Sequence, residues 1–417
     1  MANGVRAQPR RALTLGATGG AACAVALCAL ATALSHAQVP LPPRVRSALT
    51  IDDGVIVSTE PREGASRRGL VVRGTRLPVR RRVLGTGCDA GAWLEVGVDA
   101  WVCERFVELS ELAPAGVPQP TTTPGALLPY RYAFVSTDGT RAYARPSDYE
   151  SDDYVEAYSE GFGLALTGHT VFERMGFART MRGLWVPEDS LRYPRGSDFA
   201  GVLLPPGAPL DLAWIVRPRA TVRGPVRRAT RWASRFDVLH VAAAERGALR
   251  LSDGATVSAR DVARAPARPR PDGVGATDRW IDVDVASQTL VAYEGDRPVF
   301  ATLVSTGRAM PNHETPLGVH RLWVKLASSN MDDLEREDVE RNYSIENVPW
   351  VQYFQGSNGF HAAFWHEDFG RRRSHGCVNL SPRDARWLFE FTRPSLPPGW
   401  SAILPTAHDP ATVVRVQ

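Results

Sequence analysis

The sequence predicts a mainly β protein in which two or three small β-barrel modules precede one larger C-terminal β domain. Short apolar alternations and glycine turns fill the first three segments, without a convincing helical period. Proline-rich stretches at 114–129, 194–209 and 264–278 separate the segments. With 417 residues, of which 44% are hydrophobic, the chain is long enough for several domains. We predict modules at 44–112, 130–193 and 210–264 and a C-terminal domain at 279–405.

Residues 1–37 have the composition of an export signal. A positively charged start is followed by the apolar run Ala12–Leu34, and small residues precede Gln38. We therefore expect a cleaved signal peptide and an exported protein of the periplasm or cell envelope. The alternative is a retained N-terminal membrane anchor, because the apolar run is about long enough to span a bilayer.

The charge of the chain gives little support to a nucleic-acid partner. The formal net charge is +4, and removing residues 1–37 with their three arginines leaves 4 − 3 = +1. A phosphate backbone is bound by basic residues clustered on one face. Lys325 is the single lysine among 49 basic residues, a bias that we attribute to coding and not to binding.

The first module contains a predicted hairpin, Trp93–Val96 followed by Ala100–Cys103. In an oxidising compartment Cys88 and Cys103 would pair across this hairpin, although two separate buried thiols are the alternative. Beyond the signal, Cys377 is then left without a partner. An unpaired exported thiol is a liability unless it is used.

The second module ends on a similar Trp-Val pattern, Arg182–Pro187, and the third, with Ala213–Val216, fits this pattern less well. The first two modules resemble bacterial Src-homology-3-like barrels. Such modules could hold cell-wall polymer, or they could be spacers and packing partners.

The C-terminal domain begins with a predicted half-buried strand. Ile281, Val283 and Val285 alternate with Asp282 and Asp284, which should face solvent. Further strands follow a meander and indicate a mostly antiparallel sheet. They are expected at 290–293, 298–305, 319–326, 350–353 and 359–360.

A helix should follow Cys377. Ser381 is a good N-cap, Pro382 suits the first helical position and Asp384 lies in the first turn. We expect this helix to reach about Thr392 and to pin the loop that carries Cys377 against the sheet. Its predicted inward-facing residues are Ala385, Leu388 and Phe389.

The chemistry is predicted to centre on the Cys377 thiol. A free thiol titrates near 8.5, so a neighbouring imidazole would have to raise its thiolate fraction. His361, at the end of a predicted strand, is the candidate base, and His375 is tied to the same loop. We expect His361 to be exposed, so that its replacement would spare the fold. Backbone N–H groups around Gly376 and Cys377 would stabilise an oxyanion.

These residues resemble the catalytic signature of the L,D-transpeptidase (YkuD-type) family. His361, a twelve-residue gap and Ser374-His375-Gly376-Cys377-Val378-Asn379 carry the resemblance, with Val304–Gly307 and Thr315–Gly318 upstream. It covers roughly Trp280–Pro405. Two positions depart from many members: Ala362 stands where glycine or serine is usual, and Asn379 where arginine often stands.

The resemblance implies a β-sandwich catalytic domain that uses neither metal nor other cofactor. Cys377 would be the nucleophile, His361 the proton acceptor and donor, and peptidoglycan stem peptides the substrate. The expected enzyme activity includes L,D-carboxypeptidase activity as a side reaction. The acceptor and the oligomeric state are left open. Residues expected at the substrate are Ser374, Asn379, Tyr353 and Arg373.

Alternatives remain for several of these residues. Arg371, Arg372 and Arg373 could form a solvated face instead of a carboxylate site. The aromatic residues Trp350, Tyr353, Phe364 and Trp365 either line the donor pocket or belong to the core. Two other functions compete with the enzyme: a non-catalytic wall-binding protein, and a zinc site built from His361, His366, His375 and Cys377.

Overall fold

The computed structural model describes residues 37–89, 91–226, 229–332 and 344–417. The predicted signal peptide therefore lies outside the described residues, apart from its last residue. Within the described residues the fold is mainly β, with 45% strand and 6% helix, as the sequence predicts. In the described part of the chain, the helices are too short and too polar to cross a membrane.

The first module packs a small core of valines, leucines and Trp400 between its strands. Cys88 and Cys103 form a disulfide, which packs beside Trp93 and Trp101. The elements are β1 (Ser47–Thr50), β2 (Val55–Ser58), β3 (Arg67–Val71), β4 (Arg76–Pro78), β5 (Arg81–Val83), β6 (Trp93–Gly97), β7 (Ala100–Cys103), the 3-10 helix η1 (Glu104–Phe106) and β8 (Val107–Ser110).

The second module is built around β9, which pairs with both β12 and β15. Its core includes Ala133, Leu164, Ala178 and Val186. The elements are β9 (Arg131–Val135), β10 (Thr140–Tyr143), α1 (Asp148–Ser151), β11 (Tyr154–Tyr158), β12 (Gly163–Phe172), β13 (Met175–Thr180), β14 (Trp185–Pro187), η2 (Glu188–Ser190) and β15 (Leu191–Arg192).

The third module forms a seven-stranded sheet in the order β19-β18-β22-β21-β20-β17-β23. The elements are β17 (Leu212–Ile215), β18 (Arg219–Arg223), β19 (Thr230–Ser234), β20 (Val238–Glu245), β21 (Ala248–Leu251), β22 (Thr256–Ser258), η3 (Ala259–Asp261) and β23 (Val262–Arg264). The likeness of any module to Src-homology-3 barrels stays a prediction.

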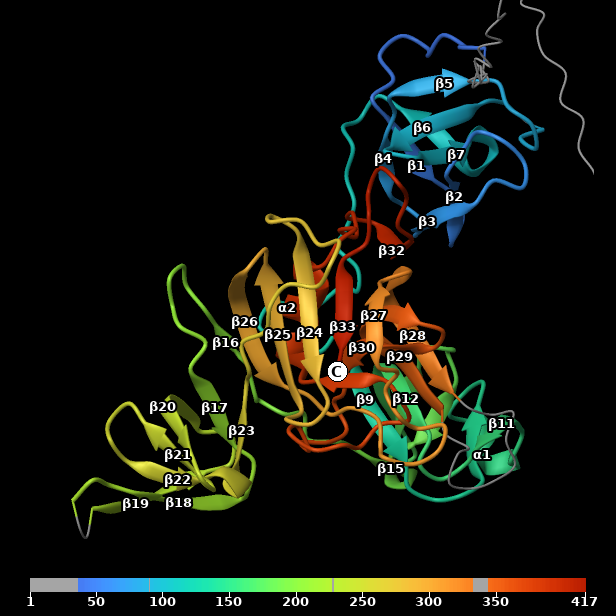
Figure 1. Cartoon of the computed structure of the whole chain (residues 1–417). Coiled ribbons are helices and arrows are strands. Elements are labelled where there is room, and N and C mark those ends of the chain that lie inside the picture. The colour runs from blue at the N-terminus through green and yellow to red at the C-terminus, as the bar shows by residue number, and fades with distance from the viewer. Residues whose placement is uncertain (1–36, 90, 227–228, 333–343) are drawn as a thin grey trace, which may run out of the picture. The chain divides into compact units, whose positions relative to one another are not determined.

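The C-terminal domain starts with the predicted meander, whose strands run side by side in Figure 1. The last strand of the chain lies parallel to the first strand of this meander, so the sheet continues beyond residue 405. The sheet order is β16-β26-β25-β24-β33-β27. Its strands are β16 (Val202–Leu203), β24 (Arg279–Asp284), β25 (Thr289–Glu294), β26 (Arg297–Leu303), β27 (Gly318–Arg321) and β33 (Val413–Val416).

The prediction that β24 is half-buried is wrong, because both of its faces are covered. Asp282 is 1% exposed and Asp284 is 6% exposed. Asp282 accepts hydrogen bonds from Arg415 (2.6 Å), which lies in the neighbouring strand β33, and from Gln417, which directly follows that strand. Asp284 accepts from Arg268 and from the backbone of Ser287. Buried carboxylates are tolerated because these donors satisfy them.

A second group of strands faces the first sheet. The expected strand at 319–326 is two strands, because the chain crosses from one sheet to the other around buried Leu322. The strands are β28 (Val324–Asp332), β29 (Ser344–Gln355), β30 (Asn358–Ala362), β31 (Val378–Leu380) and β32 (Trp400–Ile403).

The predicted helix is α2 (Pro382–Phe391), and Ser381 caps it by accepting a hydrogen bond from the Asp384 N–H. The inward-facing residues Ala385, Leu388 and Phe389 are buried, as predicted. They join one apolar core with Ile281 and Val283 of the first sheet and with Phe360 and Val378 of the second. The core thus fixes the strands on both sides of the Cys377 loop.

Candidate active site

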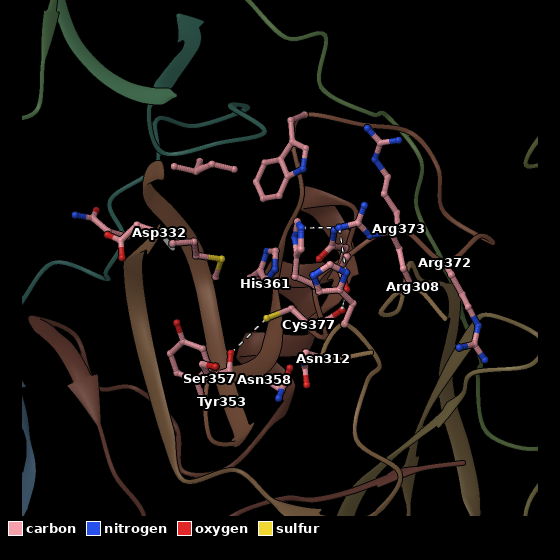
Figure 2. A pocket seen from close by; sticks show the side chains of 18 of the residues that line it. Arg308, Asn312, Asp332, Tyr353, Ser357, Asn358, His361, Arg372, Arg373 and Cys377 are labelled. Carbon is pink, nitrogen blue, oxygen red and sulfur yellow. Dashed lines mark hydrogen bonds between the residues drawn. The ribbon is translucent and has the colours of Figure 1, made fainter. Parts of the chain in front are cut away.

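Cys377 and His361 meet at one pocket of about 900 Å³. Figure 2 shows both side chains at this cavity, with Tyr353, Ser357 and Asn358 near the sulfur and three arginines grouped on another side. Those arginines are Arg308, Arg372 and Arg373. The two residues predicted to carry the chemistry therefore share one crevice.

Strand pairing brings the two residues together. β30 and β31 are parallel, with Phe360 opposite Val378 and His361 opposite Asn379. Cys377 immediately precedes β31, so its side chain emerges beside the strand that carries His361. A bridge between Ser305 and Asn379 holds β31 from the other side.

Cys377 as a whole residue is partly exposed, and its thiol donates weakly to the Ser357 carbonyl, with 3.5 Å between sulfur and oxygen. Burial of the sulfur raises the pKa of Cys377 to about 11, while a hydrogen bond from the Gly359 backbone acts in the opposite direction. The resting thiol is therefore protonated at neutral pH. The sequence predicts that a neighbouring imidazole raises the thiolate fraction, but desolvation of the sulfur outweighs the hydrogen bond from Gly359.

His361 is only 2% exposed, which corrects the expectation of an exposed imidazole. Its ring stacks on Trp365, with 5.7 Å between centroids. Nδ1 lies 3.1 Å from the carbonyl oxygen of Ala362. Since a carbonyl can only accept, Nδ1 carries the proton and Nε2 keeps a free lone pair. Burial lowers the pKa of His361 to about 4, so the ring is neutral and can accept a proton at pH 7.

The turn before Cys377 requires its glycine. Gly376 has φ +127°, and a Cβ there would lie 2.1 Å from Oδ1 of Asn358. Its N–H donates to the Ser374 hydroxyl (3.1 Å), so this expected oxyanion donor is already engaged. The Ser374 hydroxyl in turn donates to the Cys377 carbonyl. Ser374 thus holds the shape of the turn as well as lining the pocket.

Thr315 is a site residue that the sequence analysis did not single out. Its hydroxyl donates to the Gly376 carbonyl (2.8 Å) and accepts from the Gly307 N–H (2.8 Å). This one side chain ties the two upstream motifs to the cysteine turn. Its place at the start of Thr315–Gly318 was the signal that could have identified it.

His375 faces Arg308 and another histidine. Nε2 of His375 accepts from Arg308 (2.7 Å), and its ring meets His313 edge to face, with 4.6 Å between centroids. The same guanidinium lies 3.3 Å from Nδ1 of His313. These contacts of His375 fit a residue that shapes the loop. The sequence analysis missed Arg308, which directly follows the Val304–Gly307 motif.

Asn379 is 3% exposed, and its side-chain amide lies 3.0 Å from Nε2 of His366. The Asp368 N–H donates to Nδ1 of the same ring. Burial lowers the pKa of His366 to about 3, so the ring is neutral and holds its proton on Nε2. The structure places Nδ2 of Asn379 at this N–H and leaves its Oδ1 buried without a hydrogen-bond partner among the described residues, so exchanging the two amide atoms would pair the oxygen with the N–H. The amide is thereby fixed at the pocket wall.

The remaining predicted residues divide between pocket and core. Tyr353 and Trp365 line the pocket, whereas Trp350 and Phe364 are buried in the core. Arg373 lines the pocket and pairs with Asp368 (2.7 Å). Arg371, Arg372 and Arg373 are all exposed.

The described residues contain no group of three or more His, Cys, Asp and Glu side chains placed to hold a metal ion. Three of the four candidate ligands are engaged elsewhere. His361 bonds a carbonyl, His366 bonds Asn379 and the Asp368 N–H, and His375 bonds Arg308.

Fold and site together define a cysteine-histidine site on a β-sandwich scaffold. Residues 278–414 match the YkuD family model, which describes an L,D-transpeptidase catalytic domain. This segment is therefore a YkuD-type L,D-transpeptidase catalytic domain. A search of curated proteins found no match.

L,D-transpeptidases are among the solved structures that are similar to the chain. A mutant of the Enterococcus faecium enzyme is 23% identical over 34% of this chain and 50% of its own, with a TM-score of 0.26. The Stackebrandtia nassauensis enzyme is 26% identical over 34% and 57%, with a TM-score of 0.24. A Mycobacterium tuberculosis enzyme is 15% identical over 70% and 97%, with a TM-score of 0.26. The chain thus spans about half the length of the first two structures.

Proposed function

We propose that this protein is an exported cysteine acyltransferase that carries out L,D-transpeptidation on peptidoglycan stem peptides. The observation that carries the proposal is the shared pocket of Cys377 and His361 within a segment that matches the YkuD family. The arginines at the pocket give it a positive side, which suits the carboxylates of a stem peptide.

The proposed reaction begins from a neutral thiol and a neutral imidazole. Sγ of Cys377 attacks the carbonyl carbon of the third residue of a tetrapeptide stem while Nε2 of His361 takes the thiol proton. The Cys377 N–H is the donor that we assign to the oxyanion, because the Gly376 N–H is occupied by Ser374. The Ala362 carbonyl holds the ring in the tautomer that this step needs.

His361 gives up a proton twice to complete the catalytic cycle. As the tetrahedral intermediate collapses, the bond to D-alanine breaks and the imidazolium gives its proton to the leaving amine. An acceptor amine then attacks the thioester and passes its proton to Nε2, and that proton returns to the departing sulfur. An amine from another stem would give a cross-link, a free D-amino acid would give exchange, and water would give L,D-carboxypeptidase activity.

The test is incubation of the full exported chain with tetrapeptide muropeptides, followed by mass spectrometry. We expect released D-alanine and cross-linked or exchanged products, both abolished by Cys377→Ser and by His361→Ala. Because His361 is buried, the folded state of that variant has to be verified first by circular dichroism. Binding to sacculi without D-alanine release, unchanged in Cys377→Ala, would favour a non-catalytic wall-binding protein instead.

Export is part of the proposal and rests on the composition of residues 1–37 and on the disulfide Cys88–Cys103. Cell fractionation should place the chain in the envelope. N-terminal sequencing would distinguish a cleaved signal near Gln38 from a retained anchor.

A further inference from the structure

Arg235 lies in the third module, in the turn between β19 and β20, outside the segment that matches the YkuD family. Its guanidinium nevertheless reaches the C-terminal domain. One terminal nitrogen donates to the Val216 carbonyl (2.9 Å), and the other donates to the carbonyls of Glu367 and Phe369 (2.9 Å each). One arginine thus joins its own module to two points of the chain that leads to Cys377.

The segment 366–373 needs such a partner because it contains no strand or helix of its own. On its inner side it is held by the chain that follows β26. The Gly370 N–H donates to the Val304 carbonyl (2.8 Å), and the N–H groups of Arg373 and Ser374 donate to the Thr306 carbonyl. From the same inner chain, the Ser305 hydroxyl donates to the Asp368 carbonyl (2.9 Å). On the outer side, Arg235 donates to the carbonyls of Glu367 and Phe369, on either side of Asp368.

Apolar packing supports the same contact. Phe369 is fully buried, and Phe199 stacks on Phe369 and packs at a tilt against Phe236, the residue that follows Arg235. Gly370 approaches Val216 so closely that a Cβ there would lie 2.7 Å from a Val216 methyl group. Arg371 adds a second bond to the Val216 carbonyl (3.3 Å). The third module therefore packs against the segment through side chains as well as through Arg235.

The path from this contact to the nucleophile is short. Asp368 pairs with Arg373, which precedes Ser374, and the Ser374 hydroxyl bonds both the Gly376 N–H and the Cys377 carbonyl. A shift of segment 366–373 would move this turn and change the placement of sulfur against the His361 ring. Displacements on the order of 1 Å can cost a hundredfold in rate.

We propose that Arg235 is a positioning residue and that the third module braces the loop that carries the nucleophile. This inference rests on the proposed role of Cys377 and extends it to a module outside the YkuD match. The third module then has the function of bracing this loop, which differs from wall binding and from spacing. Lysine would replace arginine poorly, because an ammonium cannot present the planar fork that spans three carbonyls.

The test compares Arg235→Ala and Arg235→Lys in the full chain with Arg219→Ala. Arg219 is a matched control, since it is an exposed arginine of the same module whose guanidinium lies 4.0 Å from the centre of the Trp232 ring. The first readout is amide hydrogen exchange over residues 366–377. The second is the rate at which a carbapenem acylates Cys377: sulfur bonds the lactam carbonyl carbon, the C–N bond opens and the ring nitrogen receives the thiol proton through His361.

For Arg235→Ala we expect faster exchange confined to 366–377 and an acylation rate lower by about tenfold to a hundredfold. Arg235→Lys should fall between, and Arg219→Ala should match the wild type. Wild-type exchange in Arg235→Ala would overturn the brace, and so would faster exchange with an unchanged acylation rate. Failure of the proposed function is distinguishable, because muropeptides would then stay intact while the exchange difference persists.

Discussion

At the scale of single residues, the proposed nucleophile Cys377 and the proposed base His361 are both held in their neutral forms. Burial raises the pKa of Cys377 to about 11 and lowers that of His361 to about 4. A preformed thiolate-imidazolium pair would place two charges where solvent cannot stabilise them. In the proposed mechanism, proton transfer during attack avoids a preformed pair, because charge then develops only as the oxyanion forms.

This arrangement predicts a specific pH dependence. Thiolate absorbance of the wild type should appear near pH 11 and be absent at pH 7. The acylation rate should fall as the pH drops through about 4, because protonated His361 can no longer accept the thiol proton. Ultraviolet titration and rapid-mixing acylation measure the two quantities. A thiolate signal at pH 7 that disappears in His361→Ala would instead establish an ion pair.

The sequence could identify Cys377 and His361 but not their environment. Residue type and spacing pointed to a thiol and an imidazole close together, and both line one pocket. The burial of His361 depends on Trp365 and on the surrounding sheet, so a strand-end position suggested exposure wrongly. The roles of Arg308 and Thr315 required coordinates, since their partners are up to 67 residues away.

At the scale of elements, helix α2 is fixed at both ends. Ser381 caps its start, as local sequence predicted. At its end, the buried ammonium of Lys325 donates to the carbonyls of Phe389 (2.7 Å) and Thr392 (3.0 Å). Positive charge is favourable at a helix C-terminus. From the sequence, the single lysine is explained by coding bias alone. Its role at the helix end is not visible there, because its two partners lie 64 and 67 residues away.

Lys325 should make stability depend on pH in a defined direction. Burial lowers its pKa from 10.5 to about 7. Between these values the unfolded chain binds a proton that the folded protein does not, so the contribution of this site to stability rises with pH. Below about pH 7 both states carry the proton and the contribution is constant.

The measurement is urea unfolding of the wild type and of Lys325→Met at pH 7 and pH 9. The free energy of unfolding of the wild type minus that of Lys325→Met should be larger at pH 9 than at pH 7. The increase should be at most about 1.4 kcal/mol per pH unit. Arg386→Met, at an exposed position of the same helix, should show no such change. An equal difference at both pH values for Lys325→Met would contradict the lowered pKa.

Strand β24 is a second case in which the local sequence does not predict the surroundings of a side chain. Its alternation of apolar and acidic residues predicted one solvated face, but Arg415 approaches Asp282 from 133 residues away and closes that face. Periodicity identifies a strand and its register. Whether the polar face of the strand contacts water or a buried charged residue depends on residues far away in the sequence, here Arg415.

At the scale of the whole molecule, the proline-rich boundaries suggested independent modules, but all three contact the C-terminal domain. β3 pairs with β32, and Arg235 reaches segment 366–373. In the second module Glu346 accepts from the Ala165 N–H (3.1 Å), and Gly163 pairs with Ile345. Such contacts are invisible in sequence because they join residues more than a hundred positions apart.

Tyr132 is the residue of the second module best placed to test this coupling. It is 4% exposed, its ring stacks on Phe364 with 3.9 Å between centroids, and its hydroxyl donates to the Asn347 carbonyl (2.7 Å). Phe364 meets Trp365 edge to face, and Trp365 stacks on His361. The second module is therefore linked to His361 by a chain of three aromatic contacts, which runs through Phe364 and Trp365.

Tyr132→Ala should lower the free energy of unfolding by about 3 kcal/mol, because it removes a buried ring at the contact between module and domain. It should also slow acylation of Cys377, since Trp365 and His361 lose the packing behind Phe364. Tyr154→Ala is the matched control, a 47% exposed tyrosine of the same module, and should change neither quantity by much. Chemical unfolding and carbapenem acylation rates measure the two effects. If the two variants behaved alike, the second module would have no effect on His361, and the support of His361 would come from the C-terminal domain alone.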